Sequence, residues 1–287
     1  MSGYAKSSSS RSVTHRLLVD ALRREGRLLE DARRACRKRP TPTRIHAVRV
    51  ATRRLLAPVA LAEIVDSAKG KALRKALRRL LKVTGKARDL QVQLRLVETQ
   101  IPRHPELRPF RRQLRKKARR AALHVGPGLS QGRTKELLGL LVQALAKCSG
   151  GGDLERRLRR ELRAVIARVP RSRVAGSPTA KAFHLGRLAV KEARYLAETL
   201  HPVFVPDRGR WVRDLQRRQR LTGEIHDLQN LVTRLLRYVE RKRSGKPALQ
   251  PVLRQLGLQG LQRLRTYRTH RDVTPPSLRR GDLIRCR

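Results

Sequence analysis

Two short stretches of the chain place a histidine and two cations at the spacing of one helical face. They read His46-x-x-Arg49-x-x-x-Arg53 and His184-x-x-Arg187-x-x-x-Lys191. Residues at i, i+3 and i+7 lie on the same side of a helix, so each stretch directs its imidazole and its two cations in one direction. Guanidinium groups suit phosphate oxygens, which they bind through paired, charge-assisted hydrogen bonds. The spacing therefore predicts a site for a long, phosphate-rich anion.

A second pair of similar segments lies at the same offset in the chain. The offset is 138 for the two histidines (184 − 46), and it is again 138 (222 − 84) between Thr84-Gly85-x-x-Arg88-Asp89 and Thr222-Gly223-x-x-His226-Asp227. Equal offsets predict an internal duplication. We expect each glycine to interrupt its helix, and each aspartate to orient a neighbouring cation or cap a helix rather than act as a general base. Arg88 and His226 are expected to reach the same basic site.

The chain as a whole carries a large positive charge. Its 287 residues include 70 Lys and Arg against 22 Asp and Glu, a formal net charge of +48. Such an excess destabilises a compact state through self-repulsion, and a polyanionic partner offsets it while releasing counterions. Further basic rows at helical spacing run through residues 71–82, 108–119 and 210–220. An arginine-rich genome or a solvated surface explains part of the excess, but not the histidine at the start of both aligned stretches.

The sequence disfavours several classes of function. Aromatic residues make up only 3%, which leaves little material for stacking nucleic-acid bases. No phosphate-binding glycine loop, nucleophile elbow, zinc-protease motif or carboxylate cluster for magnesium is present, so we expect no enzyme, no metal and no cofactor. Three scattered cysteines indicate a reducing compartment, and no apolar run reaches the roughly 18–20 residues of a membrane span. These features predict a cytoplasmic protein without membrane contact.

Apolar residues recur at helical spacing along the chain, and no segment alternates as a strand would. We predict an all-α protein built as two helical bundles related by the repeat. The predicted parts are a flexible tail at 1–12, a first half at 13–148, a second half at 149–271 and a basic tail at 272–287. Within the halves, Gly126-Pro127-Gly128 is expected to close a helix at 110–123, and residues 252–256 and 261–269 are expected to form two short helices.

Four segments together resemble the signature of the CHAD family, the conserved-histidine α-helical domain. They are Ile45–Leu55, Thr84–Leu90, Phe183–Tyr195 and Gly223–Asp227, which occur in the family's order over a resemblance spanning roughly residues 13–270. The resemblance implies two four-helix bundles with pseudo-two-fold symmetry around a basic central groove or pore. It also implies binding of inorganic polyphosphate and association with polyphosphate granules. The alternating Glu-x-Glu-x-Lys strand of the phosphohydrolase to which many family members are fused is absent, so the chain resembles a stand-alone binding module.

The predicted ligands come from both halves. Carried over from the family, they are His46, Arg49, Arg53, Arg54, His184, Arg187, Lys191 and Arg194, to which Arg78, Lys82, Arg88 and His226 are added. Arg78 stands where the family often has a basic residue, but its repeat mate (78 + 138) is Gln216. This difference argues against strictly symmetric use of the site, although the neighbouring Arg217 could supply the cation that Gln216 lacks.

Three alternatives remain open at this point. Phosphate contacts alone do not distinguish polyphosphate from nucleic acid, so non-sequence-specific nucleic-acid binding is the second hypothesis. A polyphosphate-processing enzyme is disfavoured by the missing metal-binding acids, and a granule scaffold that recruits other proteins is compatible with binding. If the histidines titrate near their ordinary pKa of about 6.5, polyphosphate should bind more tightly as the pH falls.

Overall fold

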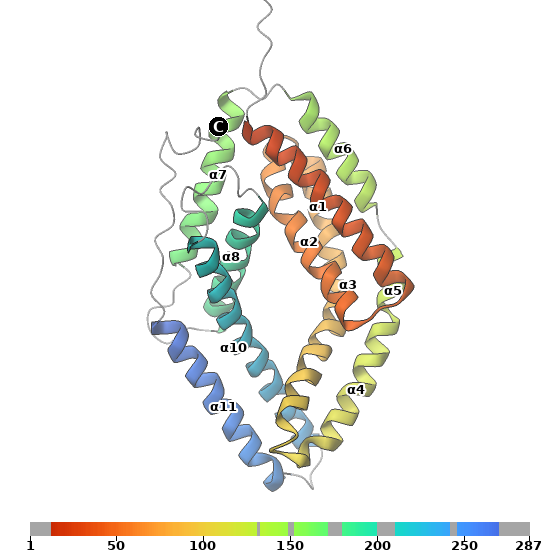
Figure 1. Ribbon diagram of the computed structural model, residues 1–287, viewed down its shortest axis with the longest axis vertical. Coiled ribbons are helices and arrows are strands. Elements are labelled where there is room, and N and C mark those ends of the chain that lie inside the picture. The colour runs from red at the N-terminus through yellow and green to blue at the C-terminus, as the bar shows by residue number, and fades with distance from the viewer. Residues whose placement is uncertain are drawn as a thin grey trace, which may run out of the picture.

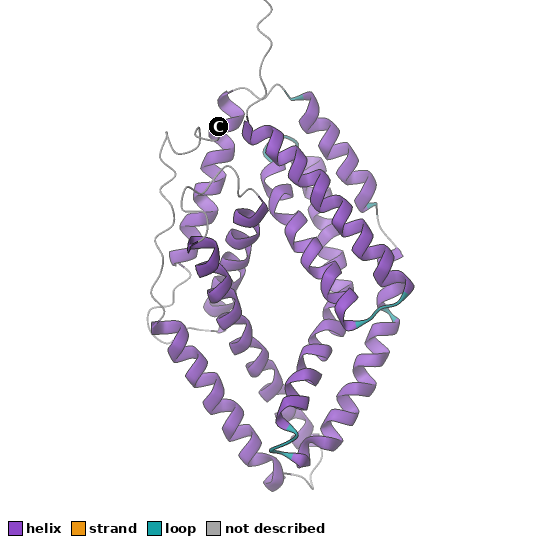
Figure 2. Ribbon diagram, in the orientation of Figure 1, coloured by secondary structure: helices purple, strands orange, loops and turns teal. Residues whose placement is uncertain are grey.

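The computed structural model describes residues 13–130, 133–148, 152–171, 180–199, 210–241 and 246–269. Within these ranges the elements are helices, as the sequence predicts, and Figure 2 shows no strand among the coloured residues. They are α1 (Val13–Lys38), α2 (Pro42–Ala62), α3 (Ser67–Gln100), η1 (Pro105–Leu107), α4 (Arg108–Leu123), α5 (Val125–Ser130), α6 (Thr134–Lys147), α7 (Gly152–Arg171), α8 (Ala180–Thr199), α10 (Arg210–Arg241) and α11 (Lys246–Thr269). The two predicted tails, and residues 149–151 of the predicted boundary, lie outside the described residues.

Each half pairs inner helices with outer helices. In the first half α1 packs on α2 and α4 packs on α3; in the second half α7 packs on α8 and α11 packs on α10. Figure 1 shows the ribbons of α2, α3, α8 and α10 framing a diamond-shaped arrangement, with the outer helices along its sides. The first half also contains α5 and α6, which pack on α1 and α3 and have no described counterpart in the second half.

The two halves meet through equivalent helices. The bounds of α2 moved by 138 residues give 180–200 (42 + 138 and 62 + 138), and α8 spans Ala180–Thr199. These two helices pack against each other, and so do α3 and α10. A further contact joins η1 to α11, where the imidazole of His104 hydrogen bonds through Nε2 to Gln255 and through Nδ1 to Glu106, at 3.0 Å. The side chains of the two predicted stretches are therefore carried on neighbouring helices.

Local sequence explains why α2 forms where it does. Thr41 caps its N-terminus by accepting a hydrogen bond from the backbone N–H of Arg44 (3.3 Å), and Pro42 occupies the first helical position, where its missing N–H costs nothing. Ile45, Val48 and Leu55 are fully buried, while His46 is exposed. The helix thus buries its apolar side chains and leaves the neighbouring basic positions for other contacts.

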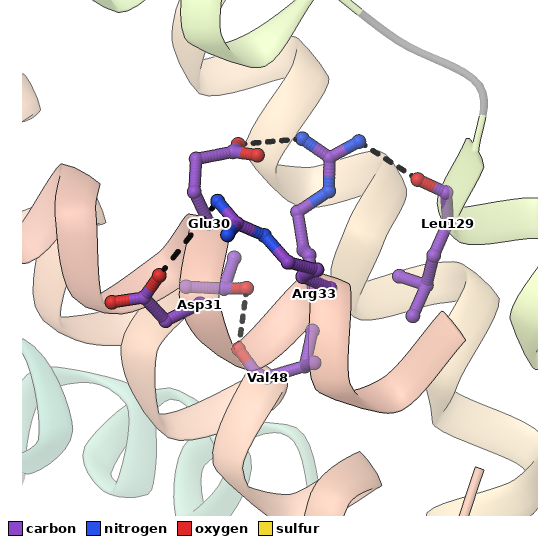
Figure 3. A network of polar contacts seen from close by, with 7 residues as sticks. Glu30, Asp31, Arg33, Val48 and Leu129 are labelled. Carbon is purple, nitrogen blue, oxygen red and sulfur yellow. Dashed lines mark hydrogen bonds and ion pairs between the residues drawn. The ribbon is translucent and has the colours of Figure 1, made fainter. Parts of the chain in front are cut away.

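A buried arginine joins α1 to α5. Arg33, only 7% exposed, donates through Nη1 to Glu30 of the same helix and through Nη2 to the backbone oxygen of Leu129, each at 2.7 Å (Figure 3). Most buried arginines need such partners, because an unpaired charge is costly away from water. Arg33 therefore belongs to the structural framework rather than to an anion site.

Two expectations about helix ends are wrong. Gly85 lies inside the continuous helix α3 and Gly223 inside the continuous helix α10, so neither interrupts its helix. A glycine in a helix interior costs about 1 kcal/mol relative to alanine, which buried residues on both sides, such as Leu80 and Leu90, outweigh. The two short helices expected after residue 251 are also wrong: they form the single helix α11, which contains Pro251.

The Gly126-Pro127-Gly128 segment does not lie between helices either. It falls within the short helix α5, and the break after α4 occurs at His124. Buried Val125 and Leu129 hold this segment against the rest of the first half. No described helix is long and apolar enough to cross a membrane.

Candidate anion-binding site

Basic side chains from both halves gather where α2 faces α8 and α3 faces α10. Arg53 of α2 is close enough to lower the pKa values of Arg187 and Lys191 on α8. It likewise lowers the pKa of Arg88 on α3. Eight of the predicted ligands form what we call the central basic cluster; among them, His184 lowers the pKa of His226. Its members are His46, Arg49, Arg53, Arg88, His184, Arg187, Lys191 and His226.

Arg49 is fixed in place by α3. Its Nη1 donates to the backbone oxygen of Leu81 (2.6 Å) and to Oγ1 of Thr84 (3.1 Å), and the Thr84 hydroxyl donates in turn to the backbone oxygen of Leu80 (2.8 Å). Burial lowers the pKa of Arg49 to about 10, and the charge of Arg53 adds to this effect. Arg49 stays charged at neutral pH, so it offers a preoriented cation at the edge of the cluster.

Lys191 is the most strongly perturbed base of the cluster. Burial, followed by the positive charges of Arg187 and Arg53, lowers its pKa to about 7. The Lys191 side chain is half-buried on α8, beside the fully buried Val190 and Ala193. Close to neutral pH, Lys191 is therefore about half protonated, and an arriving anion would favour its charged form.

The two histidines with resolved shifts are neutral at pH 7. Burial lowers the pKa of His226 to about 4, with further contributions from Arg187 and Lys191, and Nε2 accepts a hydrogen bond from Asn230 Nδ2 at 3.0 Å. The His46 side chain is exposed, yet partial desolvation by its surroundings, followed by the charges of Arg88 and Arg53, also lowers its pKa. In the unliganded protein these imidazoles are hydrogen-bonding groups rather than cations.

The two repeated aspartates act across the halves. Burial lowers the pKa values of Arg88 on α3 and Arg187 on α8. The negative charge of Asp227 on α10 opposes this shift at Arg88, and that of Asp89 on α3 opposes it at Arg187. Burial raises the pKa of Asp227 itself, while Arg187 and Lys191 oppose that rise. No ion pair within 4.0 Å joins either carboxylate to another described side chain. The expected orienting role is thus electrostatic and reaches from each half into the other.

Two predicted ligands are held by a carboxylate beside the cluster. Glu198 of α8 pairs with Arg194 (3.3 Å) and, across the halves, with Arg54 (4.0 Å). Gln216, the repeat mate of Arg78, donates to the same carboxylate at 3.0 Å. The Arg194 guanidinium also lies 4.4 Å from the centre of the Tyr195 ring. An anion that bound Arg54 or Arg194 would have to compete with Glu198.

Arg78 and Lys82 lie apart from this arrangement. Both are exposed on α3. The charge of Arg78 acts on Glu63, which is ion-paired with Arg74 at 2.9 Å. Among the described residues, no contact joins Arg78 or Lys82 to the central basic cluster.

Sequence reasoning missed several residues that shape the cluster. Thr84, Asn230 and Glu198 position its basic groups or their neighbours, and Arg234 of α10 lies within electrostatic reach of Asp89. The repeated Thr-Gly pair was a signal for Thr84. Asn230 and Glu198 each have a partner one helical turn away, His226 and Arg194, so i, i+4 spacing was a signal for them, whereas the link from Arg234 to Asp89 joins two helices. The described residues contain no group of three His, Cys, Asp or Glu side chains that could hold a metal ion.

We compared the chain with models of protein families and with solved structures. Residues 20–236 match the model described as the CHAD domain. The crystal structure of the CHAD domain from the plant Ricinus communis superposes with a TM-score of 0.67 at 19% identity, covering 95% of this chain and 100% of that chain. PptA from Streptomyces chartreusis gives 0.67 at 16% identity, covering 90% and 97%. No curated protein sequence matches the chain.

Proposed function

Because the chain belongs to the CHAD domain family, we propose that it binds inorganic polyphosphate at the central basic cluster. The observation that carries the proposal is the convergence of basic side chains from α2, α3, α8 and α10 into one electrostatic environment. Five arginine and lysine side chains of the cluster act on one another there, against the two carboxylates of Asp89 and Asp227. Such an excess of positive charge is compensated best by a ligand with many negative charges.

The binding mechanism follows from the groups present. Arginine forks bind phosphate oxygens through two parallel hydrogen bonds, and a neutral imidazole donates a further one. A polyphosphate chain offers about one charge per phosphate, so successive phosphates can contact α2 and α8 in turn. Displacement of counterions from the chain adds a favourable entropy and makes the affinity depend on salt.

Binding without catalysis is part of the same proposal. The chemistry assigned to the cluster is the holding of an anion, and the protein would serve in the cytoplasm at polyphosphate granules. Non-sequence-specific nucleic-acid binding is the competing function, since a phosphodiester backbone presents similar oxygens. The low aromatic content of 3% favours an inorganic chain over bases that need stacking surfaces.

A competition titration tests the proposal. Labelled long-chain polyphosphate bound to the protein is challenged with unlabelled polyphosphate, tRNA and duplex DNA at roughly physiological salt. The test variant is Arg53→Gln/Arg88→Gln/Arg187→Gln, which removes three charges from the cluster. The control is Arg112→Gln/Lys116→Gln/Arg119→Gln, which removes three charges from exposed positions of α4.

We expect polyphosphate to compete at least about a hundredfold better than tRNA or DNA, and the cluster variant to lose at least about tenfold in affinity, as loss of charged hydrogen bonds predicts. The α4 variant should stay within about threefold of wild type. Equal competition by tRNA together with equal losses in the two variants would show that net charge alone attracts the ligand. Nucleic-acid binding would then replace polyphosphate binding as the proposed function.

A further inference from the structure

A separate cavity lies between α4 of the first half and α10 of the second. Its volume is about 270 Å³. From α4 it is lined by Phe110, Gln113, Leu114 and Lys117. From α10 it is lined by Arg234, Arg237, Tyr238 and Arg241. Both sets follow the spacing i, i+3, i+4, i+7, so each is one face of its helix, and the two faces oppose each other across the cavity.

One wall of this cavity is apolar and aromatic. Phe110 and Leu114 are each only 1% exposed, so they belong to the core and support the Tyr238 ring from behind. The Tyr238 ring, half-buried, lies with its centre 5.0 Å from that of Phe110 at an interplanar angle of 54°. Described residues give the Tyr238 hydroxyl no hydrogen-bond partner. The wall therefore combines a planar apolar surface with one polar group.

The other side of the cavity is cationic. Lys117, Arg237 and Arg241 are exposed, and Arg234 is half-buried. No lining residue is acidic, and none of these four cations has an ion pair within 4.0 Å among the described residues. Burial lowers the pKa of Arg234, while the charge of Asp89 opposes that shift. Asp89 also acts on Arg187, so the cavity lies next to the central basic cluster without sharing its side chains.

We propose that this cavity binds a nucleoside phosphate, with its base against the Tyr238 ring, which Phe110 and Leu114 support, and its phosphates between Lys117 and the three arginines. An inorganic phosphate chain would leave the apolar wall without a partner. An uncharged ligand would desolvate the four cations without compensating them. A small aromatic body that carries several negative charges satisfies both sides, and a volume near 300 Å³ is at the lower end for a small-molecule site. The guanidinium groups can also stack on a planar base.

Equilibrium dialysis with ATP, inorganic triphosphate and adenosine tests this assignment. ATP and triphosphate carry similar phosphate charge, so their ratio isolates the contribution of the base. We expect ATP to bind about tenfold or more tightly than triphosphate, since stacking of one base on an aromatic side chain is worth that much. Adenosine should bind too weakly to detect, because it lacks the phosphates.

Three variants locate the site. Arg237→Gln/Arg241→Gln should weaken ATP at least about tenfold, and Tyr238→Leu should weaken ATP but not triphosphate. The control Arg213→Gln/Arg220→Gln changes two exposed arginines nearer the N-terminus of α10 and should leave both ligands unaffected. Helix content and thermal unfolding of each variant show that it is folded. Long-chain polyphosphate, titrated on the same proteins, reports the central basic cluster separately.

Two results would overturn the assignment. If ATP and triphosphate bind equally and Tyr238→Leu changes neither, the base is not recognised. If ATP binding survives in the cavity variant but is lost in Arg53→Gln/Arg88→Gln/Arg187→Gln, the nucleotide occupies the central basic cluster instead. Either result leaves the proposed polyphosphate binding intact, since that function is judged by the long-chain ligand.

Discussion

At the scale of single residues, burial makes Lys191 a group that titrates near neutral pH. Sequence reasoning assigned the pH response to histidines at their ordinary pKa, but burial and neighbouring cations lower the pKa values of His46 and His226, the latter to about 4. The same causes bring the pKa of Lys191 to about 7. The predicted direction of the pH effect is kept, and Lys191 is added to the groups that can produce it.

Polyphosphate affinity should therefore rise as the pH falls from 8 to 6, with uptake of at most one proton per site, largest near pH 8. The anion favours the charged form of Lys191 and raises its pKa, so binding is coupled to protonation below pH 8. Calorimetric titration in two buffers of different ionisation enthalpy measures that uptake. Lys191→Arg, which is charged throughout this range, should bind with a much flatter pH dependence. An unchanged pH dependence in this variant would assign the effect to another group.

Lys191 should also lower stability at neutral pH. Its folded pKa is depressed to about 7 from 10.5, so between these values the unfolded chain holds a proton that the folded protein does not. Because protonation of Lys191 favours the unfolded chain, the free energy of unfolding decreases as the pH falls from about 10 to 7, by a few kcal/mol at most. We expect Lys191→Met to raise the free energy of unfolding at pH 7, in urea titrations, while weakening polyphosphate binding. A less stable variant would contradict the assigned desolvation.

At the scale of the elements, most helices follow from local sequence. The start of α2 follows from its capping Thr41 and from Pro42 at the first helical position, and its apolar residues Ile45, Val48 and Leu55 are buried on one side. The errors occur where a tertiary contact outweighs a local signal. Packing keeps α3 continuous through Gly85 and α11 continuous through Pro251.

Gly223→Ala should stabilise the protein. No atom lies within 4 Å of the position its Cβ would take in α10, and alanine favours a helix interior by roughly 0.5–1 kcal/mol. Gly70→Ala is the contrasting change, because its Cβ would lie 3.0 Å from the Cα of Glu63 and 2.3 Å from Cγ of the same residue, which should destabilise the start of α3. Urea unfolding of both variants measures the difference. A loss of stability in Gly223→Ala would point to contacts that the structure does not contain.

At the scale of the whole molecule, electrostatics set the affinity. Each phosphate that the protein neutralises on a flexible chain releases counterions. It contributes roughly 0.7 to the slope of log K against log salt concentration, taking single-stranded nucleic acid as the guide. Removing Arg53, Arg88 and Arg187 should therefore reduce the slope by about 2. The matched α4 variant should keep the wild-type slope, since its exposed charges lie outside the cluster. Equal reductions in both variants would mean that the ligand contacts the surface without preference.

The internal duplication also belongs to this scale. The equal offset of 138 residues and the matching bounds of α2 and α8 support it. The duplication itself stays a prediction. The pairing of α2 with α8 and of α3 with α10 is what brings the two sets of basic residues together.

The sequence by itself determined the helical class, the family, the positive charge and the choice of side chains that share a helix face. These are local properties, since periodicity and residue type fix them without knowledge of other helices. The tertiary structure alone decided that His46 and His184 belong to one cluster, that Lys191 titrates near pH 7, and that Glu198 holds Arg54 and Arg194. It also left Arg78 and Lys82 apart from the cluster. Burial and charge–charge distances depend on neighbours from distant parts of the chain, which spacing in sequence does not specify.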